Sequence, residues 1–437
     1  MTIDLFPSVN SDVTLRCTPL GCEIVRNGDT LQGNKDLATL LRACDGLSRI
    51  SDILKSNTNC PENYSLASEA ILPIVNNLVA SNIISLSKTP CRTHINCIEQ
   101  TAHIPRMISV ELTDQCNLRC VYCYQNSSPQ TRHPLRSPMK LLRHLKQLSV
   151  RGLELTGGEP TMHPDFPAIL KYACDNFDIV GLLTNGARLK AEWLESMKMS
   201  KAIPTVQICL DGPDAESVDR TAGVSGSFDR IIRGIKLTKE YGIILRIGMI
   251  LDNPGKIDLI ERTAEIAYAL NADAFIATPV LNFGRAKGHF LLDEPTLQHF
   301  LSVNDKLKQR YGKWFSREAE MPEQGDHSGC GAVRKQFAIN WTGRCKTCVM
   351  QPMEWLDFGS AYQMESLEFQ ARFEDFFKLP APGLDFCEGC SHVSYCMNCY
   401  VRAFNVLKTG IKKPSDCAWY QKNADLLCRI GFNGPIQ

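Results

Sequence analysis

The sequence has little that would direct the protein out of the cytosol or toward a charged polymer. Its first residues, MTIDLFPSVNSDVTLRC, contain neither the basic stretch nor the apolar stretch of a secretory signal. No run of about 18 apolar residues occurs, so no transmembrane helix is expected. Lys and Arg number 48 and Asp and Glu number 47, which leaves no overall field to attract nucleic acid or anionic lipid. We therefore expect a cytoplasmic protein without a membrane or nucleic-acid partner.

Cysteine, by contrast, is abundant, with 20 among the 437 residues. Thiols stay reduced in the cytosol, so clustered cysteines there indicate metal binding or catalysis rather than disulfides. The length allows two or three domains of about 100–200 residues each.

Residues 1–95 are expected to form a module of their own. Strands are predicted at 13–17 and 22–26, with a tight-turn signal at Asn27-Gly28. Three groups of apolar residues at helical spacing then predict three helices, near 37–44, 50–54 and 71–79. A hairpin followed by three helices suggests a winged-helix shape, which often binds DNA. Residues 1–90 contain seven Lys or Arg and nine Asp or Glu, a balance of about −2 that argues against a DNA-reading face. A solvated accessory domain is the alternative.

Residues 105–315 alternate between strand and helix signals. Six buried strands are predicted, at 108–112, 152–155, 179–183, 206–210, 243–251 and 274–277. This alternation predicts an α/β fold with a parallel sheet, closed or partly closed into a barrel. Chemistry in such barrels lies at the carboxyl ends of the strands. From 322 to 428 helical periodicity weakens and cysteines become frequent.

The first predicted barrel strand runs directly into Cys116-x3-Cys120-x2-Cys123. Three thiolates within eight residues can hold three corners of a cubane iron–sulfur cluster, which leaves the fourth iron open to a substrate or cofactor. A structural zinc site would normally have a fourth protein ligand. The spacing therefore favours an iron–sulfur cluster over a zinc knuckle.

This spacing resembles the signature of the radical S-adenosylmethionine (SAM) superfamily. In that family the open iron chelates the amino and carboxylate groups of SAM, and electron transfer yields a 5′-deoxyadenosyl radical that abstracts hydrogen from the substrate. The resemblance implies that Cys116, Cys120 and Cys123 hold the SAM-binding 4Fe–4S cluster. It also implies that Tyr122, the aromatic residue before the last cysteine, packs near the adenine. No motif indicates which residue handles the substrate hydrogen.

Segments at later strand ends also resemble this family. Gly157-Gly158-Glu159-Pro160 looks like the glycine-rich motif whose backbone meets the SAM amino group, and glycine permits a close approach. Two segments resemble those that reach the SAM ribose and carboxylate, Leu183-Thr-Asn185-Gly186 and Cys209-Leu-Asp211-Gly212. The family usually has serine where Cys209 stands, so Cys209 is a cofactor contact, a hydrogen-atom donor or a small buried residue. Phe283-Gly-Arg-Ala286 resembles a further segment that is common in a subgroup of this superfamily.

The C-terminal cysteines resemble the SPASM domain of peptide and protein maturases, which holds two auxiliary 4Fe–4S clusters. The resemblance assigns Cys330, Cys348 and Cys399 to the first cluster. The fourth ligand of that cluster is either Cys345 or no protein residue, which would leave one iron open. The resemblance assigns the second cluster the ligands Cys387, Cys390, Cys396 and Cys417. The family usually has x3 where x2 separates Cys396 from Cys399. A zinc ribbon is the alternative, although seven or eight ligands exceed one zinc site.

The chain as a whole therefore resembles a radical SAM/SPASM peptide maturase. The implied fold is a partial (β/α)6 TIM-like barrel at 105–315, between an N-terminal winged-helix-like, PqqD-like domain at 1–95 and a cysteine-rich SPASM domain at 322–428. Such N-terminal domains bind the leader of a precursor peptide as an added strand.

The implied activity is modification of a ribosomally made precursor peptide by a crosslink, a thioether or epimerisation. The implied cofactors are SAM and three 4Fe–4S clusters, and the implied electron donor is a reductant such as flavodoxin or ferredoxin. Two alternatives are a radical SAM/SPASM enzyme acting on a tetrapyrrole or other small molecule, and a non-enzymatic iron–sulfur electron carrier.

Overall fold

The structure, a computed structural model, describes residues 4–26, 29–57, 64–288, 293–315 and 330–432. The chain divides into two compact units, Met1–His103 and Ile104–Gln437. Each unit is described by itself.

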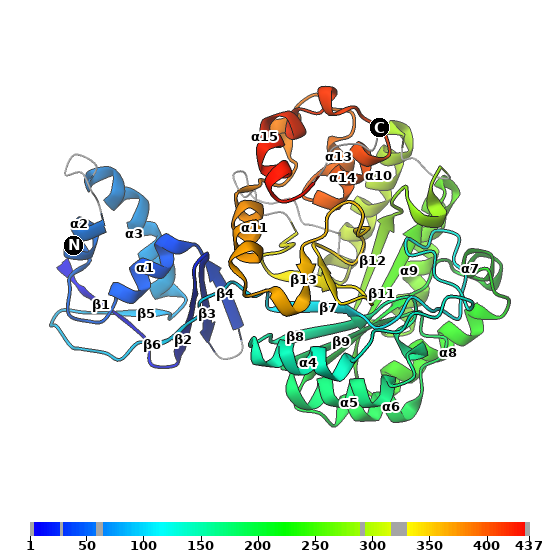
Figure 1. Cartoon of the computed structure of the whole chain (residues 1–437), viewed down its shortest axis with the longest axis horizontal. Helices are drawn as coiled ribbons and strands as arrows, with labels where there is room; N and C mark the ends of the chain where they lie inside the picture. The colour runs from blue at the N-terminus through cyan, green and yellow to red at the C-terminus, as the bar shows by residue number, and fades with distance from the viewer. Residues whose placement is uncertain (1–3, 27–28, 58–63, 289–292, 316–329, 433–437) are drawn as a thin grey trace. The chain divides into compact units, whose positions relative to one another are not determined.

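Within its described residues, the first unit combines two small sheets with three helices. Figure 1 shows these elements at the blue end of the chain. β1 (Phe6–Val9) pairs antiparallel with β5 (Ile84–Ser87), and a second sheet has the order β4-β3-β2-β6. The strands of that sheet are β2 (Val13–Thr18), β3 (Gly21–Arg26), β4 (Asp29–Gly33) and β6 (Asn96–Glu99). The helices are α1 (Lys35–Ala43), α2 (Ile50–Asn57) and α3 (Tyr64–Ala80). The strands predicted at 13–17 and 22–26 are confirmed as β2 and β3, whereas the turn predicted at Asn27-Gly28 lies outside the described residues.

Local chemistry explains where the elements of this unit begin and which way they face. α1 begins after Asn34, whose Oδ1 accepts the N–H of Leu37 at 2.9 Å. Alternation along β2 turns Val13, Leu15 and Cys17 into the core, where none of them is exposed. The helices close over this face and share its apolar core.

The second unit is built on a nine-stranded sheet with the order β12-β11-β10-β9-β8-β7-β13-β14-β15. Six parallel strands follow chain order: β7 (Met107–Glu111), β8 (Gly152–Thr156), β9 (Ile179–Thr184), β10 (Ile203–Cys209), β11 (Ile244–Leu251) and β12 (Ala274–Pro279). Helices connect them: α4 (Pro138–Gln147), α5 (Phe166–Asn176), α6 (Ala191–Lys198), α7 (Ala215–Ala222), α8 (Ser227–Glu240) and α9 (Ile260–Ala269). α10 (Glu294–Tyr311) follows the last strand. The six predicted barrel strands and their parallel α/β arrangement are confirmed.

The cysteine-rich segment continues the same sheet. β13 (Gln336–Ile339) pairs parallel with β7, and β14 (Arg344–Lys346) and β15 (Gly359–Ser360) extend it antiparallel. Among the described residues the sheet ends at β12 and β15 and does not close. The division at 105–315 and 322–428 stays a prediction, because these two segments share one sheet.

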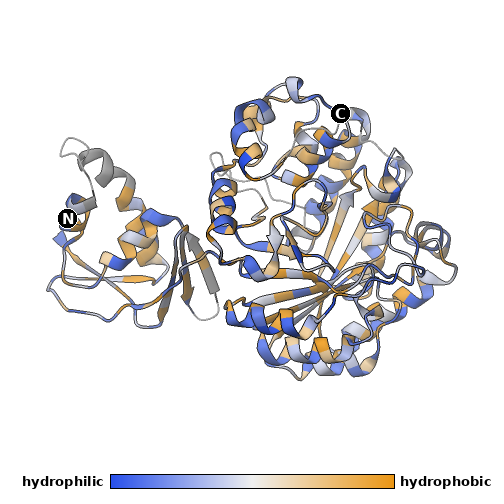
Figure 2. Cartoon of the chain, in the orientation of Figure 1, coloured by the Kyte–Doolittle hydropathy of each residue, from blue (hydrophilic) through white to orange (hydrophobic). Residues whose placement is uncertain are grey.

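The two faces of the parallel strands differ in polarity. One face is apolar, with Leu153, Val180 and Val206 buried on it, and it lies under the connecting helices, with α5 against β9 and α8 against β10. Figure 1 shows these helices along one side of the sheet, and Figure 2 shows that much of the central strands is hydrophobic. The other face carries polar side chains: Ser109 Oγ donates to Glu154 Oε2 at 2.5 Å, and Arg246 Nε donates to Gln207 Oε1 at 2.6 Å. Side chains on this face can therefore hydrogen-bond polar groups of a ligand.

Helices dominate the C-terminal part despite its weak periodicity. They are α11 (Leu367–Lys378), α12 (Leu384–Cys387), α13 (Val393–Cys396), α14 (Tyr400–Lys408) and α15 (Ala418–Arg429). Two of these have four residues, too few to produce a helical period in the sequence. An aromatic core anchors the segment to the sheet, with Phe337 of β13 packed edge-on against Phe373 of α11 at a centroid distance of 5.1 Å.

Candidate active site

The loop after β7 carries the three cysteines of the CX3CX2C motif. Burial raises the pKa of Cys116 to about 12, and it raises the pKa of Cys120 well above its usual value. Cys116 and Cys120 pack in one small cluster, and Cys123 N donates to Cys120 O at 3.1 Å, so the three cysteines lie close together. Thiols in this setting ionise when a metal binds them. Two N–H groups also point at the Cys116 sulfur, from Leu118 N at 3.4 Å and Asn185 Nδ2 at 3.7 Å. Three thiols with amide donors are a donor set that fits an iron–sulfur cluster.

The end of α7 holds the cysteine loop from one side. Arg119 N donates to Ala222 O at 2.9 Å, and Val121 N donates to Thr221 O at 3.0 Å. The backbone between the first and third cysteines is therefore fixed by the last turn of a helix.

The Phe283–Ala286 segment, part of which forms the short 3-10 helix η5 (Gly284–Ala286), holds the loop from the other side. Arg285 Nε donates to Cys120 O at 2.7 Å, and Arg285 N donates to Cys123 O at 3.1 Å. Gly284 has φ +62°, and a Cβ there would lie 2.5 Å from Cys123 O. Glycine is therefore required for this close approach.

Gly157 and Gly158 pack against the backbone that leads into the cysteine loop. Gly158 N donates to Thr113 O at 2.7 Å. A Cβ on Gly158 would lie 2.5 Å from Gln115 O and 2.6 Å from Asp114 O, and a Cβ on Gly157 would lie 2.4 Å from Thr113 O. The glycines thus allow two strand ends to approach each other. The predicted contact of this motif with SAM stays a prediction.

Glu159 ties the end of β8 to the end of β9. Its carboxylate is fully buried and accepts from Thr161 Oγ1 at 2.6 Å, from Thr184 Oγ1 at 2.8 Å and from Asn185 N at 2.9 Å. Pro160 follows it as the first residue of the 3-10 helix η3 (Pro160–Met162). Burial raises the pKa of Glu159, and these hydrogen bonds oppose that rise. The carboxylate therefore orients the two strand ends.

Asn185 connects β9 to the cysteine loop. Its Nδ2 donates to Asn117 Oδ1 at 2.9 Å as well as toward the Cys116 sulfur, and its Oδ1 accepts Ala187 N at 3.0 Å. A residue predicted to contact the cofactor thus also lies against a predicted cluster ligand.

Tyr122, Cys209 and Asp211 meet at the carboxyl end of β10. Tyr122 Oη donates to Asp211 Oδ2 at 2.6 Å, and Ile250 N donates to Asp211 Oδ1 at 2.8 Å. Burial raises the pKa of Asp211, with the nearby Lys256 ammonium opposing it. Burial also raises the pKa of Cys209 to about 12, with repulsion from the Asp211 carboxylate next. The structure thus brings together three of the predicted cofactor-binding residues.

Two buried ion pairs near this site were not predicted from the sequence. Lys256 Nζ lies 2.5 Å from Asp252 Oδ1, and the Lys256 side chain is 1% exposed. Lys346 Nζ lies 2.6 Å from Glu111 Oε1. The sequence does indicate that Glu111 needs a buried partner, because it is a charged residue within the otherwise uncharged strand that precedes the cysteine motif.

The cysteines predicted for the first auxiliary cluster lie together. Burial raises the pKa of Cys348 to about 12, and repulsion from Cys330 and Cys399 contributes. Cys330 N donates to Asn398 O at 3.2 Å, which brings residue 330 beside Cys399.

The cysteines predicted for the second auxiliary cluster form a neighbouring group. Burial raises the pKa of Cys396, with repulsion from Cys399, Cys417, Cys390 and Cys387. Lys412 Nζ donates to Cys390 Sγ at 2.8 Å, a contact that the sequence did not predict.

Cys345 faces away from this region. It is fully buried in β14, and the charges that affect its raised pKa belong to Asp357 and Arg344. Its neighbour Lys346 points to Glu111, and side chains alternate along a strand. Cys345 therefore lies on the opposite face of β14 from the side chain that reaches the barrel.

Comparison with known proteins identifies the family. The model of the radical SAM superfamily matches residues 110–265, which include the cysteine loop and the ends of β8, β9 and β10. A mycofactocin maturase, MftC of Mycobacterium tuberculosis, is 33% identical over 271 residues, covering 60% of this chain and 68% of that protein. The chain belongs to the radical SAM superfamily, whose members use SAM and a 4Fe–4S cluster.

Other relatives cover more of the chain. The antilisterial bacteriocin subtilosin biosynthesis protein AlbA of Bacillus subtilis is 27% identical over 447 residues, covering 97% of each chain. SuiB of Streptococcus suis bound to S-adenosylmethionine has the same fold, with a TM-score of 0.58 and 18% identity, covering 90% of this chain and 96% of that one.

No helix within the described residues combines the length and the apolar character needed to cross a bilayer.

Proposed function

We propose that this protein is a radical SAM maturase that modifies a ribosomally made precursor peptide. The main support for this proposal is the similarity to the subtilosin biosynthesis protein, which extends over 97% of both chains. A solved structure of the same fold, SuiB, is bound to its precursor peptide SuiA and has a TM-score of 0.53. The proposal extends this use of a peptide substrate to the present chain.

Three groups of cysteines would hold three 4Fe–4S clusters. Cys116, Cys120 and Cys123 would hold the SAM-binding cluster, and the second auxiliary cluster would use the group around Cys396. The first auxiliary cluster would use Cys330, Cys348 and Cys399. We leave its fourth position open to substrate or solvent, because the buried Cys345 lies on the opposite face of β14 from Lys346.

When bound, SAM and its cluster supply the 5′-deoxyadenosyl radical that removes hydrogen from the substrate. The chain's own residues hold the reacting groups in place. Asn185 donates toward the Cys116 sulfur, and Tyr122 is held by Asp211 beside Cys120, so both can fix cofactor groups at the carboxyl ends of β9 and β10. Buried, hydrogen-bonded side chains of this kind keep a site rigid and exclude water.

The first unit would recognise the leader of the precursor by adding it as a strand. In the four-stranded sheet, β4 is an edge strand, and its central Leu31 is 52% exposed. Leu31 lies opposite the buried Ile24 and therefore belongs to the core-facing side of the sheet. An added strand would gain main-chain hydrogen bonds from β4 and an apolar contact from Leu31.

The SAM-binding cluster would receive its electrons from a reductant such as flavodoxin or ferredoxin.

A small-molecule substrate is the second candidate. An AdoMet-dependent heme synthase of Nitratidesulfovibrio vulgaris is 25% identical over 358 residues, covering 96% of that protein but 73% of this chain. About a quarter of this chain thus has no counterpart there, which favours a peptide substrate for the longer protein.

The test is turnover with candidate precursor peptides encoded beside the gene. Reduced, cluster-reconstituted enzyme with SAM should form 5′-deoxyadenosine and change the mass of one such peptide, and removing the leader should abolish the change. Formation of 5′-deoxyadenosine with a tetrapyrrole but with none of the peptides would favour the small-molecule candidate.

A further inference from the structure

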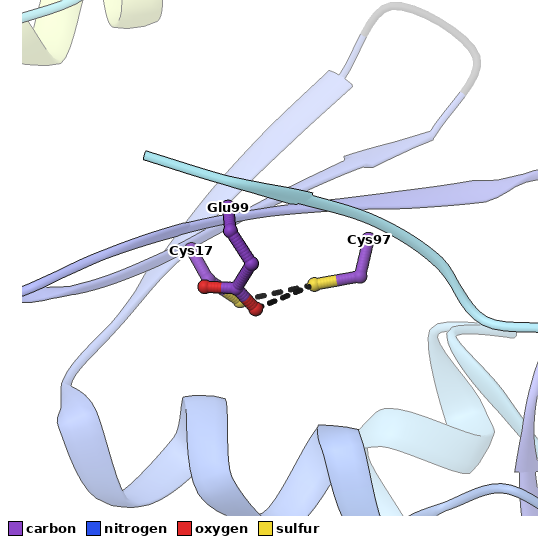
Figure 3. Close-up of side chains that lie close together, drawn as sticks. All are labelled: Cys17, Cys97 and Glu99. Atoms are coloured by element: carbon purple, nitrogen blue, oxygen red, sulfur yellow. Dashed lines mark hydrogen bonds between the residues drawn. The ribbon is translucent and has the colours of Figure 1, made fainter. Parts of the chain in front are cut away.

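Three side chains at one edge of the first unit converge in a way that the proposed function does not use. Cys97 Sγ lies 3.6 Å from Cys17 Sγ and 3.3 Å from Glu99 Oε1 (Figure 3). The ligand atoms of Cys17, Cys97 and Glu99 all lie within 4.8 Å of one another. Sequence spacing did not predict this group, because 80 residues separate its two cysteines.

The pairing of β2 with β6 brings these residues together. The two strands run parallel, with Leu15 opposite Cys97 and Cys17 opposite Glu99. Side chains two residues apart on a strand share a face, so both ligands of β6 lie on the face to which Cys17 points. That face is the one that packs toward the helices. The group is therefore a product of strand register and not of a flexible loop.

The two separations from the Cys97 sulfur match those between ligands of one tetrahedral zinc ion. Zn–S bonds of about 2.3 Å and Zn–O bonds of about 2.0 Å place two sulfurs about 3.8 Å apart and a sulfur and an oxygen about 3.5 Å apart. The observed separations, 3.6 Å and 3.3 Å, differ from these by a few tenths of an ångström. A disulfide would require the sulfurs to approach to about 2.05 Å.

The surrounding charge also suits a divalent cation. Arg42 of α1 holds the Glu99 carboxylate through Nη2 to Oε2 at 2.8 Å and Nε to Oε1 at 3.0 Å. A ligating carboxylate is usually held by a further hydrogen bond of this kind. Two thiolates and one carboxylate carry three negative charges, which zinc(II) and the Arg42 guanidinium balance. Binding would release the two thiol protons to solvent.

We propose that Cys17, Cys97 and Glu99 bind one zinc(II) ion. Soft thiolates favour zinc, a borderline-soft ion, over magnesium or calcium, which take oxygen ligands. The Glu99 side chain is 62% exposed, so the metal can enter from solvent, and a water can take the fourth position.

The ion would fasten β6 to β2. β6 has no other strand partner within the described residues, and it is the last strand before the first unit ends at His103. The site does not depend on the proposed peptide substrate.

The test is zinc content of the full chain after anaerobic cluster reconstitution, addition of zinc chloride and dialysis against a weak chelator. Filling the iron–sulfur sites first keeps zinc out of them. Wild type should retain about one zinc per chain. Cys97→Ser and Glu99→Gln, both at positions that are not buried, should each lose most of it. Cobalt(II) in place of zinc should give the visible bands of a tetrahedral thiolate site in wild type, and these should be absent from Cys97→Ser.

Two controls separate ligand loss from other effects. Cys91→Ser removes an exposed cysteine of the same unit and should retain zinc fully. Arg42→Gln breaks the ion pair but keeps all three ligands, so zinc should still bind, about 10–100-fold more weakly. Zinc should also raise the melting temperature of wild type and not that of Glu99→Gln. Equal zinc in wild type and both ligand variants would overturn the proposal, as would a Cys17–Cys97 disulfide in zinc-free wild type purified anaerobically.

Discussion

The Lys346 ammonium lies 2.6 Å from the Glu111 carboxylate, and both side chains are buried. The pair joins the end of the first barrel strand to β14 of the cysteine-rich segment. Tyr124, directly after the last cysteine of the CX3CX2C motif, lies beside both: its hydroxyl is 3.5 Å from Glu111 Oε1, and the Lys346 ammonium is 5.7 Å from its ring centre. The CX3CX2C loop, which we propose holds the SAM-binding cluster, and the segment of the proposed auxiliary clusters are thus connected through a buried charge pair.

Replacing Lys346 with methionine should destabilise the second unit by about 3–5 kcal/mol, because a buried carboxylate would lose its cation. Urea unfolding of reconstituted enzyme measures this. The double variant Glu111→Leu/Lys346→Met should recover about half of the loss, since it removes both charges. As a control, Arg310→Gln, which breaks exposed ion pairs with Glu261 and Glu265, should cost less than about 1 kcal/mol. A Lys346→Met variant as stable as the control would contradict this account.

Replacing Cys116, Cys120 and Cys123 together with alanine should abolish reductive cleavage of SAM to 5′-deoxyadenosine and methionine. Iron should fall from about 12 to about 8 atoms per chain if three clusters are present. Cys428→Ala, at an exposed cysteine, should leave both values unchanged. A wild-type iron content near four, or zinc in place of the remaining iron, would refute the auxiliary clusters, and SAM cleavage by the triple variant would refute the catalytic role.

Replacing Gly158 with valine should weaken SAM binding. It should also displace the cysteine loop. The new Cβ would overlap the carbonyl oxygens of Asp114 and Gln115, which belong to rigid backbone. We expect less cluster iron and a perturbed EPR signal as well as at least tenfold weaker SAM affinity, on the order of 1.4 kcal/mol. Gly255→Ala is the control, because its new Cβ would meet a movable side-chain atom, Asn253 Oδ1, at 3.3 Å. Normal iron and SAM affinity in Gly158→Val would show that the loops can separate without cost.

Replacing Lys412 with methionine should lower the reduction potential of one auxiliary cluster. The ammonium donates to the Cys390 sulfur at 2.8 Å, and its positive charge favours the reduced cluster. Its loss should shift that potential by on the order of −60 mV, a tenfold change for a one-electron couple. Potentiometric EPR should show one shifted and two unshifted clusters. Lys413→Met, at the exposed neighbouring residue, should shift none, and an equal shift in both variants would point to a general charge effect.

Replacing Leu31 with glutamate should weaken binding of the leader peptide at least tenfold, on the order of 1.4 kcal/mol. The change places a charge on the exposed edge strand β4 where we propose that the leader pairs. Ile98→Glu, at a 44% exposed position on the opposite edge strand β6, is the matched control. Calorimetry with the full chain and the leader alone measures both. Weakening by Ile98→Glu and not by Leu31→Glu would move the docking site to the other edge.

Much of the second unit could be predicted from the sequence because its signals are local. Each barrel strand is a short apolar run, and the spacing of Cys116, Cys120 and Cys123 lies within eight residues. The chemistry of the site follows from that spacing, since three thiolates on one loop leave one iron open. The four-residue helices α12 and α13 could not be predicted in this way, because they are shorter than the pattern that identifies a helix.

Contacts between distant residues were decided by the tertiary structure alone. Glu111 and Lys346 are 235 residues apart, and they meet because β13 pairs with β7 and brings β14 beside the barrel. Cys17 and Cys97 are 80 residues apart in the sequence, and the register of β2 with β6 brings them together with Glu99. The sequence by itself thus determined the family, the parallel α/β order and the cysteine motif, because those depend on short-range patterns. Strand order and register decided which charges and thiols meet, since pairing between distant strands leaves no periodic trace in either segment.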